Sequence, residues 1–109
     1  WNLMESMHDK RIDLGWKHAS LAEHLRSGDR LPWGFRAVYE YDFIGALEKM
    51  QQPTLLLCPE DDLWVPTHDR AQHIADVRLV ELPGAAHGFL KLDAHNIAGR
   101  IDTFLKDPM

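Results

Sequence analysis

An aspartate and a histidine each follow a predicted strand, and together these residue types can move a proton. Asp62 comes shortly after the apolar run 54–58, and His87 comes shortly after the run 77–82. Parallel strands joined by a helix bring their carboxyl ends to the same edge of a sheet. A carboxylate beside an imidazole at such an edge is two thirds of a nucleophile–base–acid relay. We therefore predict that the two side chains lie within hydrogen-bond reach or slightly beyond it.

The roles of the two residues follow from their chemistry. Histidine changes charge near neutral pH, so His87 could act as general base toward a nucleophile and then as general acid toward a leaving group. Asp62 would fix the tautomer of the ring and stabilise the imidazolium. Asp61 is a rival for the acid role, because a slip of one position would exchange the two carboxylates. The alternative is that both aspartates only cap or solvate a loop and that His87 is an ordinary turn histidine.

The elements that must position these residues form a β–α–β–α series. The run 54–58 lies between two prolines, as is typical of a short strand covered on both faces. A helix is predicted over 68–75, capped by Thr67 after Pro66. A second strand covers 77–82 and ends at a Pro-Gly pair, and an amphipathic helix covers 94–105. These elements predict an α/β fold with parallel strands.

The chain divides near residue 52. The part before it has a helical period, with a helix ending at Gly28, a loop over 27–34 and a helix over 35–41. Asp42 is placed to cap a further short helix. We therefore predict a helical cap or lead-in segment over 1–52, followed by the β–α–β–α unit over 53–109.

The second half of the chain resembles the carboxy-terminal end of an α/β-hydrolase. The stretch Pro-Glu-Asp-Asp over 59–62, with Val-Pro following at 65–66, is similar to the family's acid turn. The stretch Pro-Gly-Ala-Ala-His over 83–87 is similar to the turn that carries its histidine. The segment 1–52 would correspond to cap helices and a lead-in. One departure is Pro59, which stands where the family usually has glycine and could tilt the acid loop.

The resemblance implies a Ser–His–Asp hydrolase of small, apolar esters, amides or carbon–carbon bonds. Asp62 and His87 would be its acid and base, and Trp64 and Phe89 would line the substrate pocket, although ordinary packing explains these two rings equally well. The nucleophile is missing, because none of the three serines lies in a Gly-x-Ser-x-Gly elbow. We therefore expect the chain to be the carboxy-terminal part of a longer enzyme and to be inactive alone.

Composition excludes several other classes of protein. The chain has 109 residues and a formal net charge of −5, which argues against a nucleic-acid or anionic-membrane surface. No apolar run approaches the roughly 20 residues of a membrane span, and the amino end does not resemble a signal peptide. No Gly-x-Gly-x-x-Gly or zinc-ligand spacing occurs, so no cofactor and no metal are expected. The single cysteine, Cys58, is predicted to pack in the core, which fits a reducing cytoplasm.

The expected partners follow from the missing parts. A small-molecule substrate would occupy the site, and the absent amino-terminal half, or a second copy of the chain, would pair with the open edge of the strand 54–58. The alternative function is a non-catalytic interaction module that keeps the β–α–β–α shape without any chemistry.

Overall fold

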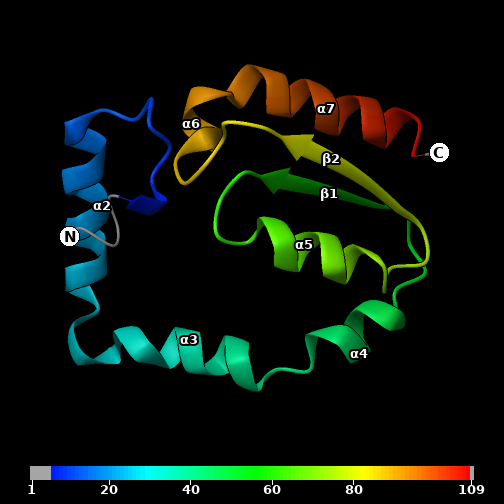
Figure 1. The fold of residues 1–109 in the computed structure, drawn as a ribbon, viewed down its shortest axis with the longest axis horizontal. Coiled ribbons are helices and arrows are strands. Elements are labelled where there is room, and N and C mark those ends of the chain that lie inside the picture. The colour runs from blue at the N-terminus through cyan, green and yellow to red at the C-terminus, as the bar shows by residue number, and fades with distance from the viewer. Residues whose placement is uncertain (1–5, 109) are drawn as a thin grey trace.

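A computed structural model describes residues 6–108 of the chain and shows a mixed α/β protein with a two-stranded parallel sheet (Figure 1). Strand β1 (Thr54–Pro59) pairs in register with strand β2 (Val77–Leu82), so that Pro59 lies opposite Leu82 at the carboxyl ends. The predicted parallel strands are therefore confirmed. This register places the loops after both strands at one edge of the sheet.

Helices lie on both faces of the sheet (Figure 1). Helix α5 (Trp64–Ala71) connects the strands, and α7 (Ala94–Lys106) follows the short helix α6 (Phe89–Leu92). Because side chains alternate along a strand, β1 and β2 present one set of residues to α5 and the other to α7. Ile97 of α7 packs with Leu82 and Ala85 in the small buried core, which Leu57, Val80 and Phe89 border.

The amino-terminal half forms a helical arm, which we define as residues 14–48. It comprises α2 (Leu14–Arg26), a 3₁₀ turn (Gly28–Arg30), α3 (Leu31–Glu40) and α4 (Phe43–Glu48). The arm runs away from the sheet along α2 and then turns back beneath it through α3 and α4 (Figure 1). None of the described side chains of these helices is buried. The arm is therefore held by local interactions more than by a core.

Capping residues account for the ends of the arm's helices. Asp13 accepts a hydrogen bond from the Trp16 N–H, and Asp42 accepts one from the Gly45 N–H, as the sequence predicted for Asp42. Gly28 follows the last turn of α2 at a φ of 56°, in the left-handed region that glycine adopts without strain. The predicted end of this helix is therefore confirmed.

Two helices begin earlier than the sequence predicts, because the prediction treats proline as a residue that cannot lie within a helix. Helix α3 begins at Leu31 and includes Pro32 in its first turn, where we had expected a loop. Helix α5 begins at Trp64 and ends at Ala71, so Thr67 lies inside the helix and does not cap it. Pro66 occupies the first turn of α5. Proline is tolerated there because the first N–H groups of a helix have no intrahelical partner.

Among residues 6–108, no helix combines the length and the apolar character that crossing a membrane requires.

Candidate functional site

Asp62 and His87 lie together beyond the carboxyl ends of β1 and β2. The Oδ1 atom of Asp62 is 4.0 Å from Nε2 of His87, and the side chains are 54% and 45% exposed. This distance is longer than a hydrogen bond, and it matches the slightly loose geometry expected of an acid–base pair without substrate. The structure therefore brings together the two residues that the sequence singled out.

The orientation of the His87 ring limits what the pair can do as it stands. In a nucleophile–base–acid relay, the carboxylate binds Nδ1 and leaves Nε2 for the nucleophile. Here Nε2 is the ring nitrogen that lies 4.0 Å from the carboxylate. The ring must therefore rotate about its side-chain bonds before Asp62 can hold Nδ1. Its 45% exposure leaves room for this rotation.

The neighbouring carboxylate, Asp61, has a different task. Its Oδ1 accepts a hydrogen bond from the Leu63 N–H at 2.8 Å, and its carbonyl oxygen accepts one from the Trp64 N–H. Asp61 therefore shapes the turn that leads into α5. Asp62 forms the 4.0 Å approach to Nε2 of His87 and has no such task in the turn, which favours it over its rival for the acid role.

Glycines shape the loop that carries His87. Gly84 and Gly88 have φ angles of 77° and 98°, in the region that other residues rarely adopt. A Cβ atom at Gly88 would also lie 2.6 Å from Cδ1 of Ile12. Gly88 thus permits both the turn after His87 and the close approach of the amino-terminal segment.

A cavity of about 610 Å³ adjoins the pair. Asp62 and His87 line it on one side, and Arg70 of α5 lies at its wall with its guanidinium 5.9 Å from the centre of the Phe43 ring. The remaining lining is mainly apolar and comes largely from the helical arm: Met7, Phe35, Val38, Tyr39, Tyr41, Asp42, Phe43, Ile44 and Leu63. We call this space the arm cavity. The sequence did not predict this aromatic lining.

Neither of the two rings that the sequence analysis assigned to the pocket lines the arm cavity. The Trp64 ring lies against His68 within α5, with ring centres 4.9 Å apart. Phe89 packs against the buried cluster of Leu82, Ala85 and Ile97. Both rings therefore contact neighbouring side chains of the fold, as the alternative explanation of ordinary packing expects.

The same edge of the sheet could hold a cation. Asp61, Asp62 and His87 each offer one ligand atom, and these atoms lie within 4.8 Å of one another. Carboxylate and imidazole groups are common metal ligands. Since Asp61 already accepts the Leu63 N–H, a bound ion would have to share that oxygen or use the other one.

A buried carboxylate, Asp9, supports the His87 loop and was missed by the sequence analysis. It is 1% exposed, and it accepts hydrogen bonds from the backbone and side chain of Arg11 and from the Ala86 N–H. The hydrogen bonds from Arg11 lower the pKa of Asp9 to about 2. Arg11 also binds Asp93, whose pKa it lowers. No local pattern signals this contact, since the partners are far apart in sequence.

A second acid–base cluster lies on the α5 face of the sheet. His68 Nδ1 is 2.7 Å from the Trp64 carbonyl oxygen, and Nε2 is 2.8 Å from Oε1 of Glu81. Both contacts raise the pKa of His68, the carbonyl contact most. The Cys58 Sγ atom is 3.7 Å from Nδ1.

This cluster is not arranged for nucleophilic catalysis. The Trp64 carbonyl can only accept, so Nδ1 carries a proton and has no lone pair for the thiol. Cys58 is fully buried, and burial raises its pKa, whereas a reactive cysteine needs access and a lowered pKa. The structure therefore agrees with the predicted packing role of Cys58.

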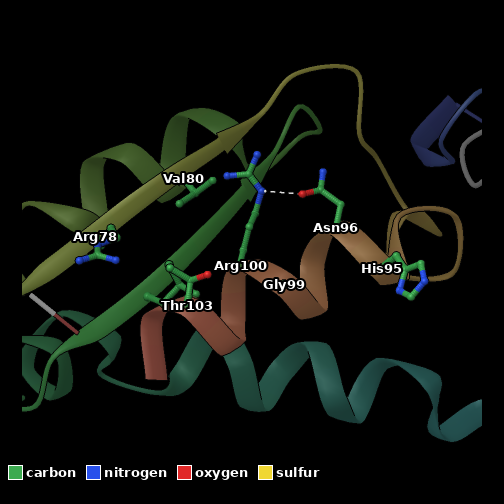
Figure 2. Close-up of a pocket in the computed structure, with 8 residues that line it drawn as sticks. Arg78, Val80, His95, Asn96, Gly99, Arg100 and Thr103 are labelled. Carbon is green, nitrogen blue, oxygen red and sulfur yellow. Dashed lines mark hydrogen bonds between the residues drawn. The ribbon is translucent and has the colours of Figure 1, made fainter. Parts of the chain in front are cut away.

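A further cavity, of about 440 Å³, lies between the sheet and α7 (Figure 2). Leu55 and Val80 line it from the strands, and polar side chains line it from α7. Arg100 extends from α7 across the sheet, and its Nε donates to Oδ1 of Asn96 at 3.1 Å (Figure 2). This cavity contains no carboxylate and shares no lining residue with the arm cavity. It therefore lacks the acid–base pair.

Comparison with known proteins gives no match, whether to a family model, to a curated protein or to a solved structure. The geometry of the chain itself therefore carries the argument about its function.

Proposed function

We propose that the chain is the acid- and base-bearing carboxy-terminal part of a Ser–His–Asp hydrolase of the α/β-hydrolase type. The observation that carries this proposal is the approach of Asp62 to His87 at 4.0 Å, at the ends of two parallel strands and at the wall of an apolar cavity. A loose carboxylate–imidazole pair at such a position is what a proton relay requires before its substrate binds.

In the proposed reaction His87 accepts the proton of a serine hydroxyl as the oxygen attacks the substrate carbonyl. The ring then returns that proton to the leaving group. Asp62 holds the ring in one tautomer and stabilises the imidazolium. The serine must come from outside these 109 residues, because none of the three serines of the chain stands between glycines two positions away. The chain alone is therefore proposed to be inactive.

The arm cavity defines the proposed substrate class. Its volume of about 610 Å³ and its aromatic and aliphatic lining suit a small apolar acyl or aryl group on an ester, an amide or a carbon–carbon bond. Tyr39 and Tyr41 add hydroxyl groups that can orient such a group. No cofactor is needed for this reaction.

The proposed macromolecular partner is the missing amino-terminal half, which would supply the serine. Within the described residues, β1 pairs with β2 alone, so its other edge is open to a further strand. A second copy of the chain is the competing occupant of that edge. The single, buried Cys58 thiol suits a reducing compartment, and we propose the cytoplasm.

Turnover of p-nitrophenyl butyrate tests the proposal. The isolated chain should show no saturable activity, and adding an upstream segment that carries the Gly-x-Ser-x-Gly elbow should restore it. In the restored enzyme, His87→Ala and Asp62→Asn should each lower kcat by about 10³-fold or more. Glu60→Gln removes a charge from the same loop and should change kcat by less than about threefold.

Two results would overturn the proposal. One is an upstream gene sequence without a nucleophile elbow. The other is an active complex in which His87→Ala has no more effect than Glu60→Gln.

A second candidate function, a non-catalytic interaction module, is favoured by one observation. All ten residues of α3 are exposed, including Trp33, Phe35 and Tyr39. An exposed apolar helix face can bind a partner protein. If the upstream half restores no turnover but binds the chain tightly, this function is the better account.

A further inference from the structure

The segment around Asp9 lies directly beside the loop that carries His87. The His87 N–H donates to the Met7 carbonyl oxygen at 3.2 Å, and the Asp9 N–H donates to the His87 carbonyl oxygen at 2.8 Å. His8 and His87 thus form an isolated parallel bridge. Both backbone groups of His87 are therefore held by residues that lie 80 and 78 positions earlier in the sequence.

The Asp9 side chain strengthens this contact at the neighbouring residue. Its Oδ2 accepts the Ala86 N–H at 3.1 Å, and the residue is 1% exposed. Arg11 fixes the carboxylate from the other side, because its backbone N–H and Nε bind Oδ1 at 3.0 Å and its Nη2 binds Oδ2 at 2.8 Å. Each oxygen of the Asp9 carboxylate thus accepts two hydrogen bonds.

The hydrogen bonds of Arg11 also reach the residue that precedes α7. The Nη1 and Nη2 atoms of Arg11 donate to the two carboxylate oxygens of Asp93 at 2.9 and 2.7 Å. Asp93 directly precedes α7, so Arg11 links Asp9, which holds the Ala86 N–H, to the start of that helix. A bidentate pair of this kind fixes direction as well as distance.

We propose that Asp9 is a positioning residue for His87. It holds the Ala86–His87 backbone so that the imidazole stays at the wall of the arm cavity and within reach of Asp62. The assignment of His87 as a base rests on the proposed function, whereas the mechanical role of Asp9 does not. Met7 lines the arm cavity and also accepts the His87 N–H, so this segment connects the cavity to the base.

Asp9→Asn is the sharpest change, because it keeps the shape of the side chain. An amide has only one acceptor oxygen, and its NH₂ group must then face two of the four donors. Asp93→Asn is the matched control, since it also alters the contact with Arg11 but leaves the bond between Asp9 and Ala86 in place.

Amide hydrogen exchange on the 109-residue chain measures the effect. In the unaltered chain the Ala86 and His87 amides should be protected and should open together with the Asp9 amide. Asp9→Asn should accelerate exchange at Ala86 and His87 by about tenfold or more relative to the β1–β2 amides, as expected for the loss of one buried hydrogen bond. Asp93→Asn should leave these two rates within about threefold.

The NMR signal of the His87 ring distinguishes a loss of His87 positioning from a general loss of stability. Asp9→Asn should broaden or split the Cε1–Hε1 resonance of His87 and leave that of His68 unchanged, since His68 is held by Trp64 and Glu81. If the Ala86 amide of the unaltered chain exchanges as fast as that of an unstructured peptide, the inference is overturned without any variant. Uniform acceleration of all amides by Asp9→Asn, with an unchanged His87 signal, would overturn it as well.

The exchange result and the turnover result are independent. If Asp9 protects the loop but His87→Ala does not affect restored turnover, the proposed function fails and the positioning role stands. If Asp9→Asn changes neither exchange nor the ring signal, the positioning role fails whatever the turnover.

Discussion

The β–α–β–α unit and the helical arm use their apolar residues in opposite ways. In the unit, the apolar side chains of β1, β2 and α7 face one another and enclose the cluster of Leu82, Ala85 and Ile97. In the arm, none of the described residues of α2, α3 or α4 is buried, and the apolar side chains of α3 and α4 line a cavity instead. The unit therefore contains the buried core and the Asp62–His87 pair, and under the proposed function the arm supplies the surface that recognises a substrate.

This difference explains where the site lies. The strand ends place Asp62 and His87 at the margin of the unit, and residues of α3 and of the start of α4 line the cavity beside them. An apolar surface that packed tightly against the strand ends would leave no space for a ligand. The incomplete packing of the arm is what leaves the arm cavity open.

Truncation of a core side chain should have the largest effect on stability. Leu82→Ala removes the centre of the buried cluster and should cost about 2–4 kcal/mol in the free energy of unfolding. Leu25→Ala, at a leucine of α2 that is 69% exposed, should cost less than about 0.5 kcal/mol. Urea denaturation of the two variants measures the difference. If both variants lose the same free energy of unfolding, the arm packs against a core, and the contrast between the unit and the arm is wrong.

Lowering the pH should weaken the contact between the segment around Asp9 and the loop that carries His87. The folded pKa of Asp9, about 2, lies below its ordinary value of 3.8, so its contribution is present above about pH 4 and is lost as the pH falls toward 2. A shift of this size corresponds to about 2 kcal/mol. Urea midpoints measured between pH 5 and pH 2 should fall in the unaltered chain. In Asp9→Asn this part of the decline should be absent, and an identical decline in both would contradict the assignment.

Two glycine-to-alanine substitutions should change the free energy of unfolding in opposite directions. Gly88→Ala forces alanine into a φ of 98° and brings its Cβ within 2.6 Å of Ile12, so we expect a loss of about 1–3 kcal/mol. Gly99→Ala, in α7, meets no atom within 4 Å and should stabilise the chain by about 0.5–1 kcal/mol. Thermal unfolding compares them. A neutral Gly88→Ala would mean that the amino-terminal segment does not lie against the His87 loop.

Raising the pH above neutral should have a small effect on stability, which arises from His68 and Glu81 on the α5 face of the unit. The folded pKa of His68 is raised, so its contribution is complete below the ordinary value of 6.5 and is lost as the pH rises through the folded value. Glu81→Gln should therefore destabilise the chain more at pH 5.5 than at pH 8, whereas Glu60→Gln should show no such dependence. A larger effect of Glu81→Gln at pH 8 would contradict this sign.

The sequence predicted the unit well because its signals are local. The uniform apolar run of β1, the Pro-Gly pair after β2 and the amphipathic period of α7 each act through near neighbours. Parallel strand pairing then brings the loops that carry Asp62 and His87 to the same edge of the sheet. The starts of α3 and α5 were missed because Pro32 and Pro66 can also occupy a first helical turn.

The rest of the site depends on contacts between distant residues. Asp9 looks like an ordinary surface acid in a charged stretch, and only the fold brings it to Ala86, 77 positions away. Trp64 and Phe89 follow the catalytic candidates in sequence, yet Trp64 lies against His68 and Phe89 packs against the buried cluster. The lining of the arm cavity was not predicted because it depends on the path of the arm, which no local pattern specifies.

The central claim, that the arm and the strand ends form one site, is tested most directly by binding of butyrophenone, a stable ketone analogue of an apolar ester. Titration of the isotope-labelled 109-residue chain should shift the NMR signals of Tyr39 and Phe43 together with those of Asp62 and His87, along a single binding curve. Signals of Arg100 and Thr103, in the cavity beside α7, should stay in place. Shifts confined to α7, or shifts in the arm that leave Asp62 and His87 unchanged up to saturation, would contradict the account.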